Sequence, residues 1–169
     1  YDYYLHGPLA RTVLGEHQVQ GIDYAHTIQG WPKMINGSLL SNTREMGKDG
    51  TIAYTARDAY AFALGYFNGD YTPVNTALTS STTPEALHST LNQVGLFNGN
   101  IAHTVADLKG LGGNPMARTY EYDQLNRLTR ANTATNAVAT TDTWNFTNNY
   151  FEQPSYDPNG NILTNKRNG

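Results

Sequence analysis

The side chains that could do chemistry in this sequence are carboxylates, imidazoles and hydroxyls, and their spacing decides which reactions are open to them. Asp157 precedes a proline, which makes it a candidate catalytic aspartate, but Asp123 holds the same place in a similar stretch. This equivalence favours turn capping, because an Asp side chain accepts hydrogen bonds from backbone N–H groups just ahead of it. The five histidines show no HxH or HxxxH spacing, and no serine lies in a G-x-S-x-G motif. We therefore expect no catalytic, metal-binding or cofactor-binding residues.

Two tryptophans offer a different kind of site. Aromatic faces stack on sugar rings, so Trp31 and Trp144, which have tyrosines nearby, are candidates for glycan stacking. The alternative is that each indole ring is a buried anchor in a sheet, which is the commoner fate of a tryptophan. No two carboxylates stand out from the turn-type aspartates as the pair that a glycosidase requires. An enzyme is therefore the least favoured functional class.

Composition indicates a folded, tyrosine-rich sheet. The 169 residues include 12 tyrosines and 16 glycines, with 15% charged residues and a net charge of −3. Basic residues are scattered, so we expect no nucleic-acid partner. No apolar run approaches the roughly 18 residues of a membrane span, and there is no cysteine to form a disulfide. The chain opens on tyrosine without a signal peptide, which we interpret as an internal fragment whose targeting signal lies outside it.

Three stretches of the chain repeat one pattern. In each, a tyrosine is followed four positions later by Gly or Asn and six positions later by Leu or Ile. Asp follows this tyrosine in the second and third stretches, whereas Tyr4 takes that place in the first, so the first turn is expected to lack the Asp hydrogen bond. Two of the stretches have a second tyrosine two positions earlier. The repeat positions are Tyr3, Gly7 and Leu9; Tyr120, Tyr122, Asp123, Asn126 and Leu128; and Tyr156, Asp157, Gly160 and Ile162.

This spacing is typical of a strand–turn–strand unit. Tyrosines two positions apart face the same side of a strand, because side chains alternate with a period of two. Asp caps the turn, Gly or Asn tolerates the positive φ that the turn requires, and Leu or Ile begins the return strand. One such unit cannot bury its apolar side alone, whereas stacked units can. We therefore predict an all-β architecture of hairpins in which tyrosines lock neighbouring strands.

The remaining segments add detail to this prediction. Residues 58–71 alternate bulky and small side chains, which favours a strand over a helix, and Asn68-Gly69 then signals a hairpin. Residues 84–94 follow a Thr-Pro start with helical spacing, so one short helix is expected there, within an irregular insertion at residues 76–95. Residues 131–143, rich in Thr, Ala and Asn, are typical of an exposed connection. No segment requires a domain boundary, so residues 1–169 are expected to be a single unit.

The repeats resemble those of a known family. Residues 118–128, Arg-Thr-Tyr-Glu-Tyr-Asp-Gln-Leu-Asn-Arg-Leu, resemble the YD repeat of Rhs-family proteins, which runs roughly R-Y-x-Y-D-x-x-G-R-L. Residues 157–162 resemble its D-P-N-G-N-I form, and residues 19–31 are similar to a stretch frequent in Rhs proteins of Bacteroidetes-type bacteria. Relatives in this family include bacterial polymorphic toxins, the C component of insecticidal toxin complexes and the teneurins.

The resemblance implies both a fold and a function. YD repeats form β-sheet strips that spiral into a hollow shell, and in the bacterial toxins this shell encloses a C-terminal effector. We therefore expect a secreted or cell-surface bacterial protein without enzymatic activity. Its expected partners are adjacent YD repeats and the effector of the same parent chain, with secretion machinery or surface glycans as further candidates.

Two points qualify what the resemblance implies. The Asp-Pro at residues 157–158 lacks the Arg-Phe and the second Asp-Pro of the family's autoproteolytic core, so that protease role is not carried over. The alternative function is a cell-surface adhesion or glycan-binding module of a large secreted repeat protein, acting through exposed loops.

Overall fold

The computed structural model describes residues 1–41, 44, 46–50, 55–73, 91, 94–110, 114–136 and 143–169. Over these ranges the protein is all-β, as the sequence predicts, and contains no helix. None of the described residues therefore belongs to a helix long and apolar enough to cross a membrane. The ten strands are β1 (Asp2–Tyr3), β2 (Leu9–Leu14), β3 (Gln20–His26), β4 (Pro32–Ile35), β5 (Tyr60–Gly65), β6 (His103–Leu108), β7 (Met116–Tyr122), β8 (Leu128–Thr135), β9 (Asn145–Tyr156) and β10 (Ile162–Arg167).

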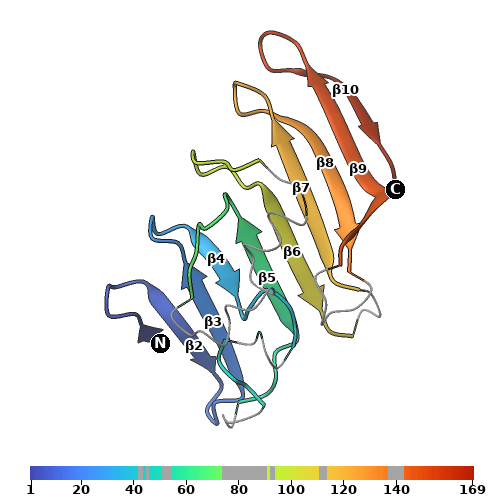
Figure 1. Ribbon diagram of the computed structural model, residues 1–169. Helices are drawn as coiled ribbons and strands as arrows, with labels where there is room; N and C mark the ends of the chain where they lie inside the picture. Colours follow the sequence, from blue (N-terminus) through green and yellow to red (C-terminus); the bar gives the residue numbers. More distant parts are fainter. Residues whose placement is uncertain are drawn as a thin grey trace.

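The strands form one open antiparallel sheet, in which their order in space is their order in the sequence (Figure 1). Each internal strand pairs with the strand before it and the strand after it, so the sheet grows by adding one strand at a time in chain order. Its two ends are β1 and β10. The turns that follow β1, β3, β7 and β9 all lie along one margin, because alternate connections in such a meander fall on the same side (Figure 1).

The two faces of the sheet carry different side chains. Residues opposite one another in antiparallel strands point to the same face, so the registers assign each side chain to a face. Along β3, β5 and β6, the residues of one face, here the covered face, are buried, and those of the other, the open face, are mostly only partly buried. The covered face carries Ala25, Met34, Ala63, Val105, Ala117 and Ala134, and the open face carries Tyr24, Ile35, Phe62, Ala106 and Met116.

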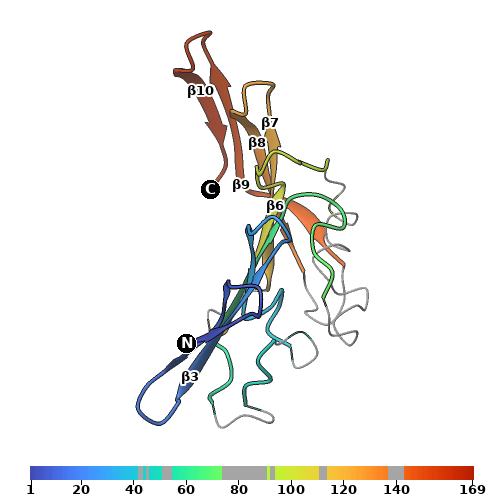
Figure 2. The same ribbon diagram turned by 90° about the vertical axis from the view of Figure 1, so that its left-hand side faces the viewer.

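The hydrophobic core lies between the covered face and segments that connect the strands. Leu39, Met46, Tyr71 and Leu91 pack from these connections into one cluster with the strand residues, and Trp144 joins the cluster just before β9. Figure 2 shows the described stretches of the long connections on one side of the sheet. Alanine and glycine on the covered face let these connections approach the strands closely, and each fully buried Leu contributes roughly 1.5–3 kcal/mol.

The structure tests three of the predictions about individual segments. Residues 60–65 form the expected strand, β5, and Asn68-Gly69 lies in a turn closed by a hydrogen bond from Asp70 N to Phe67 O (3.3 Å). The hairpin predicted there is wrong, because β5 pairs with β4 and β6, and the chain from residue 66 to residue 102 intervenes before β6. The exposed connection predicted at residues 131–143 is also wrong in its first part, because Ala131, Thr133 and Ala134 are buried in β8.

The predicted helix at residues 84–94 cannot be compared with the structure. Most of it, and most of the insertion at residues 76–95, lies outside the described residues. Leu91 is described and is 1% exposed in the core cluster.

A buried ion pair explains why residues 66–71 do not return as a hairpin. Lys33 Nζ lies 2.6 Å from Asp70 Oδ1, and both side chains are almost fully buried. Asp70 Oδ2 also accepts the backbone N–H of Tyr66 (2.9 Å), and the Tyr66 hydroxyl donates to Pro32 O (2.8 Å). The register of β3 and β4 shifts next to Lys33, and such a bulge re-aims a side chain. These contacts fold the segment after β5 back against β4.

One close approach on the covered face requires glycine. Gly65 lies opposite His103, whose side chain is buried. A β-carbon at Gly65 would overlap the imidazole ring of His103. The ring therefore occupies the space that a side chain on β5 would need, and β5 and β6 can pair in this register only with glycine at this position.

We predict that Gly65→Ala lowers the free energy of unfolding by about 1–3 kcal/mol, because overpacking a filled core forces side chains and backbone to shift. Chemical denaturation followed by circular dichroism measures this change. In a His103→Ala background the same substitution should cost less than half as much, since the overlapping ring is gone. Equal costs in the two backgrounds would contradict this account of the glycine.

Candidate functional site

The repeat positions come together in three turns of one geometry along a single margin of the sheet (Figure 1). In the turn of residues 123–127, Asp123 N donates to Arg127 O (3.0 Å) and Asn126 N donates to Asp123 O (3.0 Å). The turns of residues 4–8 and 157–161 have the same two hydrogen bonds, with lengths of 2.9–3.1 Å. The fourth residue of each turn has a positive φ, which is 112° at Gly7, 61° at Asn126 and 89° at Gly160. This is the three-residue hairpin loop closed by a left-handed residue.

The structure shows a fourth turn of this kind that the sequence comparison missed. Thr27 N donates to Trp31 O (2.8 Å), Gly30 N donates to Thr27 O (2.9 Å), and Gly30 has a φ of 84°. The Thr27 hydroxyl accepts the N–H of Trp31 (3.1 Å), as Asp123 and Asp157 accept the N–H of the fifth residue in their turns. His26 stands where those turns have tyrosine, so only the glycine at the fourth position could have signalled this turn.

The carboxylates of the repeat aspartates accept hydrogen bonds from groups of their own turns. Asp123 Oδ1 accepts the N–H groups of Leu125 (2.9 Å) and Arg127 (3.0 Å), and its Oδ2 accepts Arg127 Nε (2.7 Å). Asp157 Oδ1 accepts the N–H groups of Asn159 (2.9 Å) and Asn161 (2.8 Å). The Asn161 side-chain amide donates to Asp157 Oδ2 (2.8 Å).

These hydrogen bonds favour the ionised carboxylates. The backbone N–H of Arg127 is the largest cause that lowers the pKa of Asp123 below its usual value, and the side-chain amide of Asn161 is the largest for the pKa of Asp157. Both carboxylates are thus held as turn caps, with their oxygens engaged by donors of the same turn.

The tyrosines of the repeats bond to the preceding hairpin. The Tyr122 hydroxyl donates to Ile101 O (3.0 Å), just before β6, and the Tyr156 hydroxyl donates to Leu128 O (2.8 Å) on β8. The Tyr120 hydroxyl lies 3.2 Å from Thr104 Oγ1 on β6. Burial raises the pKa of Tyr122, which keeps its phenol protonated and able to donate. Each of these rings therefore links two hairpins through its polar tip.

The first repeat uses a different tyrosine from the one expected. Tyr3 lies opposite Leu9 in the β1–β2 pair and is 64% exposed. Tyr4, which takes the Asp position, is partly buried, and its hydroxyl donates to Tyr24 O on β3 (2.6 Å). Among the described residues, no side-chain hydrogen bond caps this turn. The link to the next hairpin is therefore made by the residue that replaces the cap.

Neighbouring turns are also joined directly. Arg127 Nη1 donates to Asp157 O (3.0 Å), and its guanidinium carbon lies 4.8 Å from the centre of the Tyr156 ring. The same guanidinium is held by Asp123 through Nε. One arginine therefore connects the cap of one turn to the backbone of the next, and a cation–π contact supports it.

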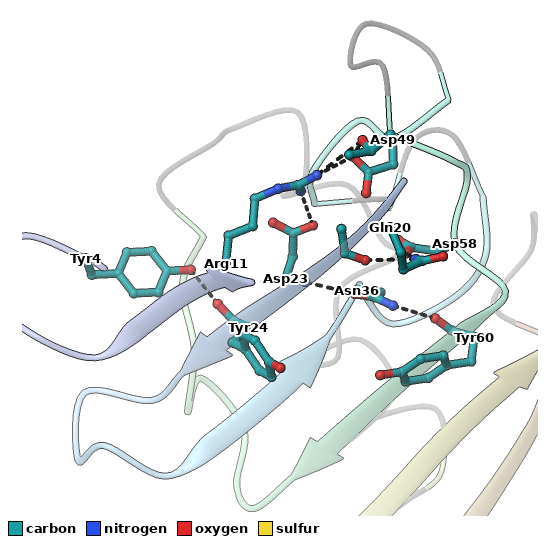
Figure 3. A network of polar contacts seen from close by, with 11 residues as sticks. Tyr4, Arg11, Gln20, Asp23, Tyr24, Asn36, Asp49, Asp58 and Tyr60 are labelled. Atoms are coloured by element: carbon teal, nitrogen blue, oxygen red, sulfur yellow. Dashed lines mark hydrogen bonds and ion pairs between the residues drawn. The ribbon is translucent and has the colours of Figure 1, made fainter. Parts of the chain in front are cut away.

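At the other end of the sheet, a polar network ties a connection to the strands (Figure 3). Arg11 on β2 forms ion pairs with Asp23 on β3 (2.5 Å) and with Asp49 in the connection after β4 (2.5 Å), and it donates to the Thr55 hydroxyl (3.3 Å). The Asp49 side chain is fully buried. Desolvation is the largest influence on the pKa of Asp23 and raises it, although the Arg11 guanidinium opposes that effect.

The network continues into the next strands and depends on two glycines. Asp23 N donates to Asn36 Oδ1 (2.9 Å), and Asn36 Nδ2 donates to Tyr60 O on β5 (3.1 Å), as Figure 3 shows. A β-carbon at Gly21 or at Gly47 would overlap the Arg11 guanidinium. Sequence reasoning missed this network, because the charged partners are 12 and 38 positions apart and follow no repeat.

The two tryptophans have different surroundings. Trp144 is 8% exposed and belongs to the core cluster, so its ring is not at the surface. Trp31 is partly buried, with its ring 5.0 Å from that of Tyr66 and in the space beside Gly99. In the described part of the chain, no three His, Asp or Glu side chains form a group that could hold a metal ion.

The carboxylates of Asp123 and Asp157 make the stability of the protein depend on pH in the acid range. Because the folded state lowers the pKa of Asp123 and Asp157, their stabilising contribution is present above the unfolded pKa of about 3.9 and is lost as the pH falls through the folded value. We expect the free energy of unfolding to fall below about pH 4. The double variant D123N/D157N should be less stable at pH 6 and should show a shallower fall.

Denaturant titrations at a series of pH values measure this difference, and Glu16→Gln removes an exposed carboxylate outside these turns as the matched control. Identical pH profiles for the wild type and the double variant would contradict the proposed role of the caps.

The chain was also compared with known proteins. No protein-family model matches it, and the search of curated proteins found no significant similarity.

Proposed function

We propose that this chain is a section of wall in an Rhs/YD-repeat shell, which encloses and helps deliver a C-terminal effector of the same polypeptide. One observation carries the proposal. The sheet grows in strict sequence order, strand by strand, and both of its ends are strands that could pair further. Such a unit can be extended by adjacent repeats at either end without any change of topology.

The links between hairpins support a wall rather than an isolated domain. Tyr122 and Tyr156 each reach the backbone of the preceding hairpin, and Arg127 reaches the next turn. These contacts run along the sheet and cross from one unit to the next. From β6 to β10, neighbouring units are therefore joined by side chains as well as by strand pairing, which is what a continuous strip requires.

The last hairpin presents an unprotected edge. All six residues of β10 are exposed, and β10 pairs only with β9. Asn168 N donates to Phe151 O (3.0 Å), and backbone groups alternate along an antiparallel strand, so the N–H of Asn165 points away from β9. An edge of this kind pairs with another strand when one is available. In the proposed shell, the adjacent repeat fills this place.

We predict that the 169-residue chain on its own self-associates through this edge. Sedimentation velocity over a range of concentrations should show oligomers, and Asn165→Pro should suppress them, because proline removes an outward N–H without removing a hydrogen bond to β9. Asn165→Thr keeps the N–H and is the matched control, so it should behave as the wild type does. A monodisperse monomer at every concentration would count against the wall model.

Enclosure itself can be tested on the parent polypeptide. We expect limited proteolysis to leave the segment C-terminal to the wall intact, while the same segment expressed without the wall is digested rapidly. Gly65→Ala, which weakens the covered face, should raise the cleavage rate of that segment. Equal cleavage rates with and without the wall would overturn the enclosure function.

A further inference from the structure

A polar cleft opens on the covered side of the sheet, where β7, β8 and β9 meet. Its volume is about 400 Å³, which falls in the range of small-molecule sites. The registers place Thr119 opposite Asn132 and Glu121 opposite Arg130, so these four side chains form a polar floor on two adjacent strands. Phe146 and Asn148 of β9 and the buried Leu91 also line the cleft.

The floor of this cleft is ordered but leaves its strongest hydrogen-bonding groups available. Arg130 Nε donates to Asn132 Oδ1 (3.0 Å), and Asn132 Nδ2 donates to Thr119 Oγ1 (3.5 Å). In the part of the chain that the structure describes, no hydrogen bond or ion pair engages the carboxylate of Glu121, the terminal nitrogens of Arg130 or the amide of Asn148. The cleft therefore offers both acceptors and donors to a ligand.

An aromatic surface lies beside these polar groups. Phe146, near the start of β9, lines the cleft, and its side chain is 54% exposed. The guanidinium of Arg130 lies 5.4 Å from the centre of the Phe151 ring, which holds the floor against β9. An exposed ring next to paired donors and acceptors is a surface that can contact the apolar face of a sugar while its hydroxyls are bound.

The backbone next to the cleft is strained. Thr147 pairs with Thr133, and Glu152 pairs with Ala131. The chain therefore advances five residues along β9 but only two along β8, so β9 bulges out of the pairing. Within this bulge, Tyr150 has a φ of 57°, a conformation that a bulky residue rarely adopts. Bulges re-aim side chains at sites, and strain of this kind collects where ligands are held. The bulge places Asn148 at the cleft and leaves its amide without a partner among the described residues.

We propose that this cleft binds a short glycan through the side chains of Glu121, Arg130, Asn148 and Phe146. Sugar hydroxyls both donate and accept, so adjacent hydroxyls can bond Glu121 and Arg130 at once, while the C–H face of the ring packs on Phe146. Of the described residues that line the cleft, Glu121 is the one carboxylate, so the site binds without the second carboxylate that glycoside hydrolysis uses. The proposal does not depend on the shell function.

Other ligand classes fit the cleft less well. A simple anion is repelled by Glu121, and a simple cation is repelled by Arg130, because each charge lies opposite the other on the floor. A free amino acid could pair with both charges, but it would use Asn148 and the Phe146 ring only if its side chain suited both. A polyhydroxylated ring uses all four.

The test is a printed glycan array probed with the purified chain, followed by saturation-transfer NMR with the best-bound oligosaccharide. We expect binding to a restricted set of glycans, and at least a tenfold loss of affinity in Glu121→Gln, Arg130→Met and Phe146→Ala. Glu16→Gln and Phe97→Ala are matched controls, because they remove an exposed carboxylate and an exposed ring away from the cleft, and they should bind as the wild type does. Circular dichroism confirms that each variant is folded.

Three results would overturn the proposal. The first is an array on which the folded wild-type chain binds no glycan above background. The second is glycan binding that persists in all three cleft variants, which would place the site elsewhere. The third is binding of free amino acids, rather than glycans, that the same variants abolish.

Discussion

Each repeat turn is closed by one residue in the left-handed conformation, and the placement of every later side chain depends on that closure. Gly7, Gly30, Asn126 and Gly160 hold this position in four turns along one margin of the sheet. The bulge at a turn sets the register of the strands that leave it. A slip of one residue would move an entire strand's side chains to the other face. Since each strand pairs with the next in order, the assignment of side chains to the two faces passes from strand to strand.

The packing of the connections on the covered face depends on this register. Its alanines and glycines leave room for connections that bring their own charged groups into the interior, as Asp70 does to Lys33 and Asp49 does to Arg11. Buried ion pairs add little net stability, but removing one partner leaves a charge without compensation and costs about 3–5 kcal/mol. These pairs therefore fix the path of the connections more than they strengthen the fold. The small residues beneath them make that path possible.

The sequence was most informative where the chain repeats itself. The turns at residues 123–127 and 157–161 could be predicted because Asp and a residue tolerant of positive φ recur at fixed spacing, and both act locally. The turn at residues 27–31 was not predicted because a Thr hydroxyl, in place of an Asp carboxylate, accepts the backbone N–H that caps it. Tertiary contacts were invisible for a different reason, since the partners of Arg11 are brought together only by strand pairing.

Composition misled at residues 131–143. Thr, Ala and Asn are typical of exposed connections, but small side chains also suit the interior of a sheet, and Ala131, Thr133 and Ala134 are buried in β8. The same ambiguity hid the cleft, because Glu121, Arg130 and Asn132 look like ordinary polar positions of two exposed strands. Only the register shows that they face the same side and lie opposite one another.

The two faces of the sheet differ in regularity, which suits the two proposed roles differently. On the open face, partly buried residues such as Tyr24 and Phe62 form a surface set by strand pairing alone. On the covered side, long connections and the bulge of β9 add features that the pairing does not dictate. A wall that encloses needs regularity, whereas a site that recognises a ligand needs a local departure from it. Because the bulge lies within β9 while the turn after β9 keeps the repeat geometry, this chain can make such a departure without losing the register of its last hairpin.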